Sequence, residues 1–156
     1  MKVFKAYVGN VVDGDTVTVY HIPKWRSYST KYPITIRLAG IDAPELCKSG
    51  NQPFAMDATR NLKILCEKRI ILVEPVGVCK YGRLLAYLYV KINEDFINLN
   101  GHLVELGLAH FYNKSFTKFG KYKEFLYQKE QTAKMNNLGV WQLESVTMPW
   151  DFRKSK

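Results

Sequence analysis

Cysteine is scarce in this sequence, and its placement argues against two kinds of site. Cys47, Cys66 and Cys79 lie far apart, and no two of them form a C-x-x-C pair. A disulfide framework needs more cysteines, and a structural zinc site is usually built from paired thiolates. Because the number is odd, at least one thiol has no partner within the chain, which favours a reducing compartment.

Histidine is also rare, and His21, His102 and His110 show neither metal-ligand nor triad spacing. His102 is expected within a helix, and the other two in loops or at the surface. No cluster of His and Cys therefore competes for a soft metal.

Long apolar runs are missing as well. No stretch is long enough to span a bilayer, and no apolar signal-peptide region follows Met1. Apolar alternation begins at once with Val3 and Phe4, so the chain is expected to start at the edge of a domain. It is then either a short intracellular protein or a form from which a leader or membrane anchor has been trimmed, and both alternatives stay open.

Acidic residues are outnumbered: 14 Asp and Glu face 23 Lys and Arg, which gives a formal net charge of +9 and a pI near 9.4. Such an excess attracts polyanions. Nucleic acid is the first candidate and an anionic membrane surface the second, although many small proteins are simply basic. The 156 residues, 47% of them hydrophobic, suffice for one domain with its own core. No obligatory protein partner is evident, and a monomer is expected.

The residue pattern predicts strands, a helix, more strands and then further helices. β-branched residues flank an Asp-Gly turn between Val8 and Val19, which indicates strand, turn and strand. Pro53 suits the first turn of a helix, Asn100 is expected as an N-cap and Gly107 as a C′ residue. Further strands are expected at 34–38, 69–76, 83–90 and 96–99, helices at 52–67, 100–107 and 122–136, and loops at 21–33 and 77–82. Five or so short strands with helices predict a small α+β domain built on a barrel.

Three carboxylates stand on the predicted connections. Asp15 follows the Asp-Gly turn and Asp42 follows the strand at 34–38. Functional groups concentrate on connections, and carboxylate, carbonyl and water oxygens are the ligands that Ca²⁺ or Mg²⁺ requires. Glu45, just beyond Asp42, is placed to accept a proton from an attacking water. Each has a structural alternative, because Asp commonly caps turns and an isolated Glu is usually a surface residue.

Arginines and aromatic residues supply the complementary chemistry. Arg37 lies at a polar position of a strand and Arg83 at the start of another, and a guanidinium matches phosphate oxygens in pairs. The alternative for each is a surface salt bridge. Groups that can stack on bases or hold phosphates, or else rim the core, are Lys48, Lys80, Tyr81, Phe111 and Tyr112. Glu130, on the last predicted helix, is expected to be a structural hydrogen-bond partner.

Four motifs resemble the staphylococcal nuclease (thermonuclease) family in order and approximate spacing. They are Val-Asp-Gly-Asp-Thr-Val at 12–17, Ile-Arg-Leu at 36–38, Gly-Ile-Asp-Ala-Pro-Glu at 40–45 and Lys-Tyr-Gly-Arg at 80–83. Gly-Leu-Ala at 107–109 and Leu-Gly-Val-Trp at 138–141 are also similar, so the likeness runs from about Val3 to Trp141. Each motif alone is weak, whereas the four in order carry all five charged candidates.

The resemblance implies an OB-fold barrel of five strands with three α-helices, and a nuclease that cuts DNA and RNA to leave 3′-phosphate ends. It implies Ca²⁺ held by Asp15, Asp42 and the carbonyl of Ala43, with Glu45 as the proposed general base. Arg37 and Arg83 would contact the scissile phosphate, and Tyr81 and Tyr112, with Lys80 beside them, would bind the nucleotide. Residues 1–142 would form the nuclease domain, and residues 143–156 a basic, loosely held C-terminal tail.

Some positions depart from the family pattern. Ala43 replaces a Thr of the founding enzyme, which a carbonyl ligand tolerates, and Cys79 replaces an acidic residue, which puts the substrate preference in doubt. The chain around Tyr112 differs in length, which weakens that assignment. Two alternatives to an active nuclease stay open: a non-catalytic nucleic-acid-binding OB module, and a protein-interaction or membrane-associated domain, favoured only by the basic, aromatic tail.

Overall fold

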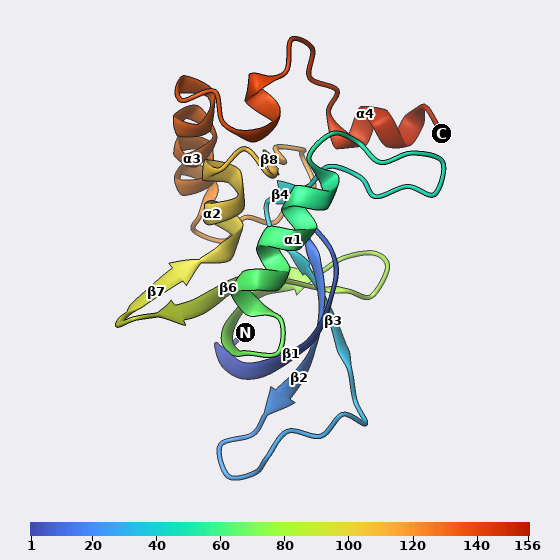
Figure 1. The fold of residues 1–156 in the computed structure, drawn as a ribbon. Helices are drawn as coiled ribbons and strands as arrows, with labels where there is room; N and C mark the ends of the chain where they lie inside the picture. Colours follow the sequence, from blue (N-terminus) through green and yellow to red (C-terminus); the bar gives the residue numbers. More distant parts are fainter.

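The protein, a computed structural model of residues 1–156, is built around a closed β-barrel (Figure 1). Its main sheet has the strand order β3-β2-β1-β5-β6-β7, and a parallel pairing of β3 with β6 closes the first five strands into the barrel. The strands are β1 Phe4–Asp13, β2 Thr16–Ile22, β3 Ile34–Leu38, β5 Ile70–Val78, β6 Leu84–Ile92 and β7 Asp95–Asn98. The predicted α+β OB-fold with a five-stranded barrel is thus confirmed, with β7 as an additional edge strand.

The turn between β1 and β2 is held tightly against the rest of the domain. Alternating residues of both strands, such as Val8 and Val17, are fully buried, as the β-branched pattern predicted. A Cβ on Gly14 would lie 2.8 Å from the Cβ atoms of Ala43 and Ala58. Only glycine therefore lets the turn approach this closely, and the approach fixes the carboxylates on either side of it.

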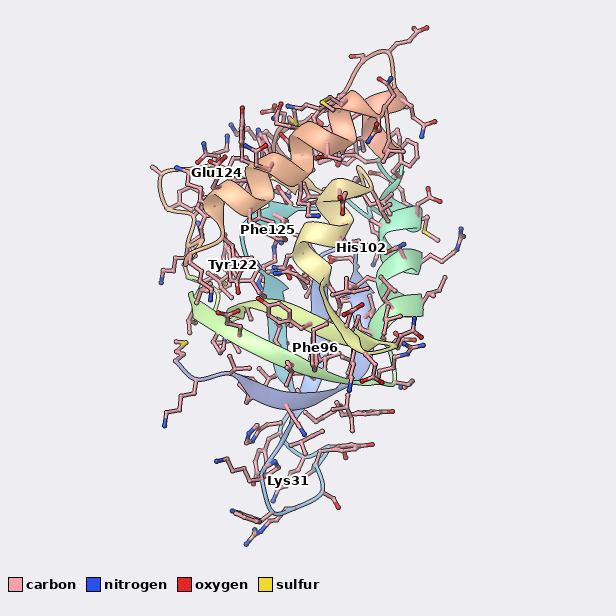
Figure 2. All side chains as sticks on the ribbon, turned by 90° about the vertical axis from the view of Figure 1, so that its left-hand side faces the viewer. Lys31, Phe96, His102, Tyr122, Glu124 and Phe125 are labelled. Carbon is pink, nitrogen blue, oxygen red and sulfur yellow. The ribbon has the colours of Figure 1, made fainter.

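Three helices cover the barrel: α1 Ala55–Cys66, α2 Leu99–Glu105 and α3 Lys123–Met135. All three were predicted, with differences at their ends. α1 begins at Ala55 because Phe54 adopts a left-handed conformation, with φ 68°, so Pro53 precedes the helix. Figure 2 shows Tyr122 and Phe125 of the α3 region turned towards α2 and the barrel.

Asn100 is not the N-cap that the sequence suggested. The side chain of Asn98 caps α2 by accepting from the N–H of Gly101 at 3.0 Å, and Asn100 lies inside the helix, fully buried. Its amide Oδ1 accepts from the N–H of Leu88, and its Nδ2 donates to the carbonyls of Ala39 and Ala86. The hydrogen bonds of the Asn100 amide to three buried backbone groups stabilise the fold more than one N-cap hydrogen bond at the surface would.

The C-terminal segment is folded, not loose as expected. A 3₁₀ turn, η1 Gly139–Gln142, leads to a short helix, α4 Pro149–Lys154, with proline in its first turn. Trp150 packs at 5.4 Å from Tyr112 and 6.1 Å from His110, ring centre to ring centre. The segment therefore returns to the domain beside β4 Ile41–Asp42 and β8 His110–Phe111 (Figure 1).

None of the helices has both the length and the apolar composition needed to cross a bilayer.

Candidate active site

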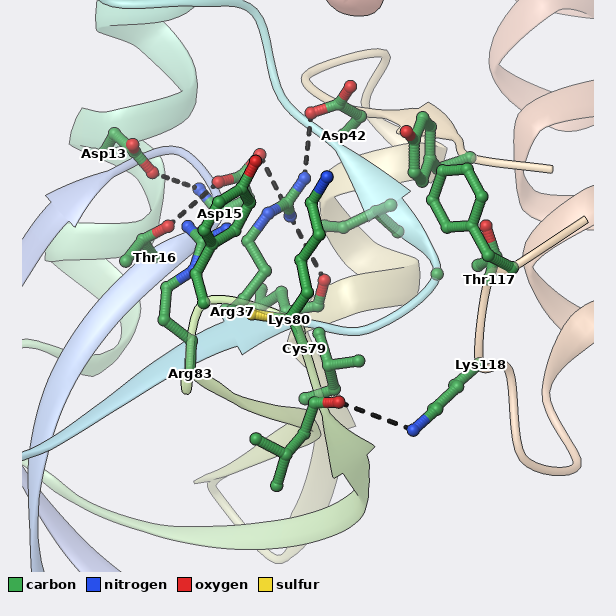
Figure 3. Close-up of a pocket in the computed structure, with 18 of the residues that line it drawn as sticks. Asp13, Asp15, Thr16, Arg37, Asp42, Cys79, Lys80, Arg83, Thr117 and Lys118 are labelled. Carbon is green, nitrogen blue, oxygen red and sulfur yellow. Dashed lines mark hydrogen bonds and ion pairs between the residues drawn. The ribbon is translucent and has the colours of Figure 1, made fainter. Parts of the chain in front are cut away.

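The candidate residues converge on one cavity of about 790 Å³ at the end of the barrel that carries β4 (Figure 3). Segments far apart in the sequence form its walls: the β1–β2 turn, β3, β4 and the loop between β5 and β6. Nearly all predicted site residues line it, namely Asp15, Arg37, Asp42, Glu45, Lys80, Tyr81, Arg83 and Tyr112. Ala43 does not line the cavity; it is buried behind Asp15.

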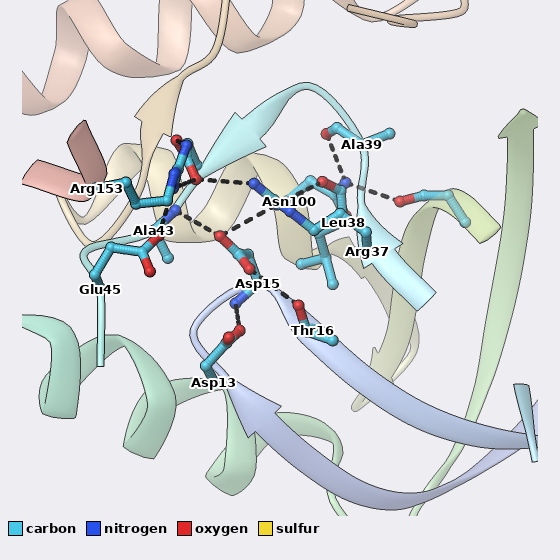
Figure 4. Close-up of polar contacts among 12 residues, drawn as sticks. Asp13, Asp15, Thr16, Arg37, Leu38, Ala39, Ala43, Glu45, Asn100 and Arg153 are labelled. Carbon is cyan, nitrogen blue, oxygen red and sulfur yellow. Dashed lines mark hydrogen bonds and ion pairs between the residues drawn. The ribbon is translucent and has the colours of Figure 1, made fainter. Parts of the chain in front are cut away.

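Asp15 is held from three sides by residues of the barrel and by Ala43, which directly follows β4. Its Oδ2 accepts from the N–H of Ala43 at 2.7 Å and lies 3.1 Å from Nη1 of Arg37. Its Oδ1 accepts from the hydroxyl of Thr16 at 3.1 Å. With only 6% of the residue exposed, this carboxylate has a fixed orientation towards the cavity (Figure 4).

Asp42 is the most deeply buried carboxylate of the site. β4 pairs with β8, which places Asp42 opposite His110, and its side chain has no exposed surface. Oδ1 accepts from Nη2 of Arg37 at 2.9 Å. Burial raises the pKa of Asp42, while hydrogen bonds and charges from Arg153 and Arg37 act in the opposite direction.

Arg37 links the two aspartates from the end of β3. Burial alone would lower its pKa, but the nearby carboxylates, Asp15 first, raise it above the usual value, so the guanidinium stays charged. Nη1 also donates to the carbonyl of Leu38 at 3.3 Å. Most of its donors are therefore committed to the protein.

Arg153 is a residue of this site that the sequence interpretation missed. It reaches the cavity from α4, with Nη2 2.7 Å from Oδ2 of Asp42 and Nη1 3.1 Å from Oδ1. Nη1 also forms an ion pair with Oε1 of Glu45. Hydrogen bonds to Asp42 raise the pKa of Arg153 above its usual value. No local motif could have identified this residue, because 111 positions separate it from Asp42.

Asp13 is the second missed residue, and here a signal existed. It is the first acid of the Asp-Gly-Asp turn, and its Oδ1 accepts from the N–H of Asp15 at 3.0 Å. Burial, followed by the charge of Asp15, raises the pKa of Asp13 to about 7. The β1–β2 turn thus brings two carboxyl groups together, and the raised pKa of Asp13 limits the negative charge that they carry near neutral pH.

The opposite wall of the cavity is basic and aromatic. Lys80 Nζ lies 5.0 Å and Arg83 Cζ 5.8 Å from the centre of the exposed Tyr81 ring. Nε of Arg83 is buried and has no hydrogen-bond partner. A buried donor without an acceptor is costly, so this nitrogen fits a site that receives an anionic ligand.

Other candidates take structural positions. Phe111 packs against Phe119 at 5.3 Å between ring centres, and its N–H donates to the carboxylate of Glu130. Phe111 and Glu130 therefore have structural roles. Tyr112 lines the cavity between Phe116 and Trp150. His110, expected in a loop or at the surface, is instead 1% exposed. The burial of His110 could not be predicted, because β8 has only two residues and so shows no alternation of apolar and polar residues.

A hard cation fits the chemistry of this donor set, but arginines occupy the carboxylate oxygens that it would need. All acidic groups present oxygen, as Ca²⁺ requires. However, no group of three or more His, Cys, Asp or Glu side chains is gathered closely enough to hold a metal ion. The oxygens of Asp15 and Asp42 instead face Arg37 and Arg153.

Comparison with known proteins identifies the family. The staphylococcal nuclease homologue family matches residues 35–143. Endonuclease Htp3 of Saprolegnia parasitica is 25% identical, with 99% of this chain and 78% of that protein covered. The micrococcal nuclease of Shigella flexneri is 28% identical, with 97% and 82% covered. A probable endonuclease LCL3 of Komagataella phaffii is 27% identical, with 94% and 73% covered. The chain belongs to the staphylococcal nuclease family.

Proposed function

We propose that this protein is a Ca²⁺-dependent endonuclease that hydrolyses phosphodiester bonds of DNA, of RNA or of both, with little sequence specificity. The observation that carries the proposal is the cavity in which acidic groups of the β1–β2 turn and β4 face Arg83 and Lys80 of the β5–β6 loop. One wall suits a cation and a water, and the other suits a phosphate.

Glu45 is the residue we assign to the attacking water. Its side chain is 29% exposed at the rim of the cavity, so solvent reaches it. The N–H of Glu45 donates to the amide oxygen of Gln52 at 2.9 Å, which fixes the backbone from which the carboxylate projects. A carboxylate held beside a phosphate can accept the proton of a water that attacks phosphorus.

The two arginines have unequal tasks. Arg83, with its unpartnered Nε, has a donor available for phosphate oxygens, whose charge grows in the transition state. Arg37 adds positive charge from the other side while it orients Asp15 and Asp42. Ca²⁺ held by Asp15, Asp42 and the carbonyl of Ala43 would supply further positive charge at the phosphate.

Base-independent contacts support the low specificity. Tyr81 is 72% exposed beside Lys80, and Tyr112 lines the same cavity. Every base has a face that stacks on an aromatic ring, and an ammonium holds any phosphate. These groups bind a nucleotide without reading the edge of its base.

The decisive experiment is cleavage of single-stranded DNA, double-stranded DNA and RNA in Ca²⁺, in Mg²⁺ and in chelator. Cleavage that requires Ca²⁺ is expected, and undiminished cleavage in chelator would contradict the metal mechanism. Binding without cleavage in any condition would favour the alternative of a non-catalytic nucleic-acid-binding module. Absence of both would favour a protein-interaction or membrane-associated domain.

Two variants test the assigned roles. Glu45→Gln is expected to lower kcat by about 10²–10⁴-fold, because an amide cannot take the proton. Arg83→Gln is expected to lower kcat/KM by about 10³-fold, because the transition state loses its phosphate donor. The matched controls are Glu94→Gln and Arg60→Gln, whose side chains are 94% and 65% exposed and lie outside the cavity. Near-normal turnover of Glu45→Gln or Arg83→Gln would refute that residue's role.

A further inference from the structure

The proposed chemistry does not use the contacts that Arg153 makes with the carboxylate of Asp42 and with that of Glu45 (Figure 4). The guanidinium approaches Asp42 with both terminal nitrogens, each facing one oxygen. This paired geometry is the strongest form of Arg–carboxylate contact. It places a fixed positive charge on the same oxygens that a hard cation would need.

The oxygens of Asp42 are fully engaged. Oδ2 accepts from Nη2 of Arg153 at 2.7 Å, and Oδ1 accepts from Arg153 at 3.1 Å and from Arg37 at 2.9 Å. Ca²⁺ binds oxygen at about 2.3–2.6 Å. A cation at that distance from Oδ2 would lie against the Arg153 nitrogen, and two positive charges so close repel strongly in a buried site. Arg153 and a divalent cation therefore cannot share this oxygen.

The carboxylate of Asp42 needs a positively charged partner, whether that partner is Arg153 or a metal ion. The Asp42 side chain is wholly buried, and a buried carboxylate deprived of a partner is strongly destabilising. A divalent cation can take over that role. Asp15 needs no such exchange, because its contacts come from Ala43, Thr16 and Arg37.

The end of α4 is built so that it can yield. Gln52 Nε2 donates to the carbonyl of Thr147 at 2.9 Å, and Lys114 Nζ lies 4.6 Å from the Trp150 ring. These contacts hold the start of the segment, ahead of Arg153. The Arg153 side chain is 41% exposed, and Lys154 beyond it is exposed. The last turn can withdraw while Trp150 remains packed.

We propose that Arg153 is a positioning residue that holds Asp42 and Glu45 in the cation-free protein and is displaced when a divalent cation binds. The last turn of α4 and the cation then compete for the same oxygens. Displacement also frees the Oε1 of Glu45, which is needed to accept a proton from water. This inference rests on the proposed function, because it takes the site to bind a divalent cation.

The first test measures cation binding without any turnover. Ca²⁺ is titrated calorimetrically into the cation-free full chain, as wild type, Arg153→Gln and Lys154→Gln. Lys154→Gln removes the same charge from the adjacent position of α4, whose side chain makes no ion pair with the site, and so controls for net charge. Arg153→Gln is expected to bind Ca²⁺ about tenfold more tightly than Lys154→Gln, because its competitor is gone. Arg153→Lys, which keeps the charge without the paired geometry, is expected to fall between wild type and Arg153→Gln.

The second test follows α4 directly by hydrogen exchange of residues 148–155. Saturating Ca²⁺ is expected to speed exchange in wild type and in Lys154→Gln, because the last turn is released. In Arg153→Gln the exchange is expected to be fast with and without Ca²⁺.

The outcomes separate the two proposals. Equal Ca²⁺ affinity in Arg153→Gln and Lys154→Gln, or unchanged exchange of wild type in saturating Ca²⁺, overturns the displacement of Arg153 and leaves the proposed nuclease intact. If none of the variants binds Ca²⁺, both the displacement and the calcium requirement of the proposed function are wrong.

Discussion

Asn100 shows at the scale of one residue how the interior supports the site. Its amide joins α2 to β6 through Leu88 and Ala86, and to the end of β3 through the carbonyl of Ala39. The chain runs from Ala39 through a left-handed Gly40 into β4. The position of Asp42 therefore depends on an amide that never reaches the cavity.

Replacement of Asn100 by Ala is expected to lower the free energy of unfolding by roughly 2–4 kcal/mol. The change leaves the N–H of Leu88 and the carbonyl of Ala39 without their partner, removes one of the two donors to the carbonyl of Ala86, and opens a small cavity. Urea unfolding followed by circular dichroism measures the loss. The control Asn136→Ala, at the exposed end of α3, should change the value by less than about 0.5 kcal/mol. Equal values for the two variants would contradict this role.

The residues of the site differ in how far sequence could place them. Asp15, Arg37 and Asp42 belong to short motifs in which the turn or strand end is itself visible, so their approach to one cavity could be predicted from the family likeness. Arg153 arrives through tertiary packing alone. The pattern also could not show that Asn98 would cap α2 while Asn100 turned inward, because both residue types and positions suit a cap.

At the scale of elements, period and length decided what could be predicted. The barrel strands alternate buried and exposed residues over five to ten positions, which gives a clear signal. α4 has six residues and β8 two, and neither is long enough for a pattern to emerge. The pairing of β3 with β6 that closes the barrel joins distant segments, so only the family likeness suggested it.

The long connection between β2 and β3 is expected to be dispensable for stability. It projects from the end of the barrel away from β4 (Figures 1 and 2), with Trp25 91% exposed. Its aromatic contacts with the barrel are made by Tyr28, which stacks on Tyr7 of β1 at 4.4 Å and on Tyr20 of β2 at 6.3 Å. The β2–β3 pairs end at Val19 and Ile34, before the loop.

Replacement of residues 23–33 by a linker of about six Gly and Ser residues is therefore expected to change the free energy of unfolding by less than about 1.5 kcal/mol. Loss of the close Tyr7–Tyr28 pair and the more distant Tyr20–Tyr28 pair is partly offset by the lower closure entropy of a shorter loop. Urea unfolding measures stability, and nuclease turnover should stay within about twofold of wild type, because the cavity is at the other end. A loss above about 3 kcal/mol would show that the loop supports the barrel.

At the scale of the whole molecule, the buried His110 and the half-buried Asp13 make stability respond to pH in opposite directions. Burial, with a smaller effect of Lys134, lowers the pKa of His110 from 6.5 to about 4. As pH falls, His110 takes up a proton in the unfolded chain before it does so in the folded chain. Its contribution to the free energy of unfolding is therefore complete above about pH 6.5 and falls as pH drops towards 4. The loss amounts to about 3 kcal/mol.

Asp13 behaves inversely, because burial and the charge of Asp15 raise its pKa from 3.8 to about 7. Its contribution to stability is therefore present below pH 3.8 and is lost as pH rises through 7.

Because the two contributions oppose each other between pH 4 and 6.5, single substitutions should separate them. Asp13→Asn is expected to make the free energy of unfolding rise more steeply with pH than in wild type, since only the His110 contribution remains. His110→Gln is expected to flatten or reverse that rise. Urea unfolding in chelator at several pH values from 4 to 7 gives the three curves. Parallel curves would mean that neither group titrates differently in the folded and unfolded chains, and that burial at this end of the barrel does not set the pH range of the protein.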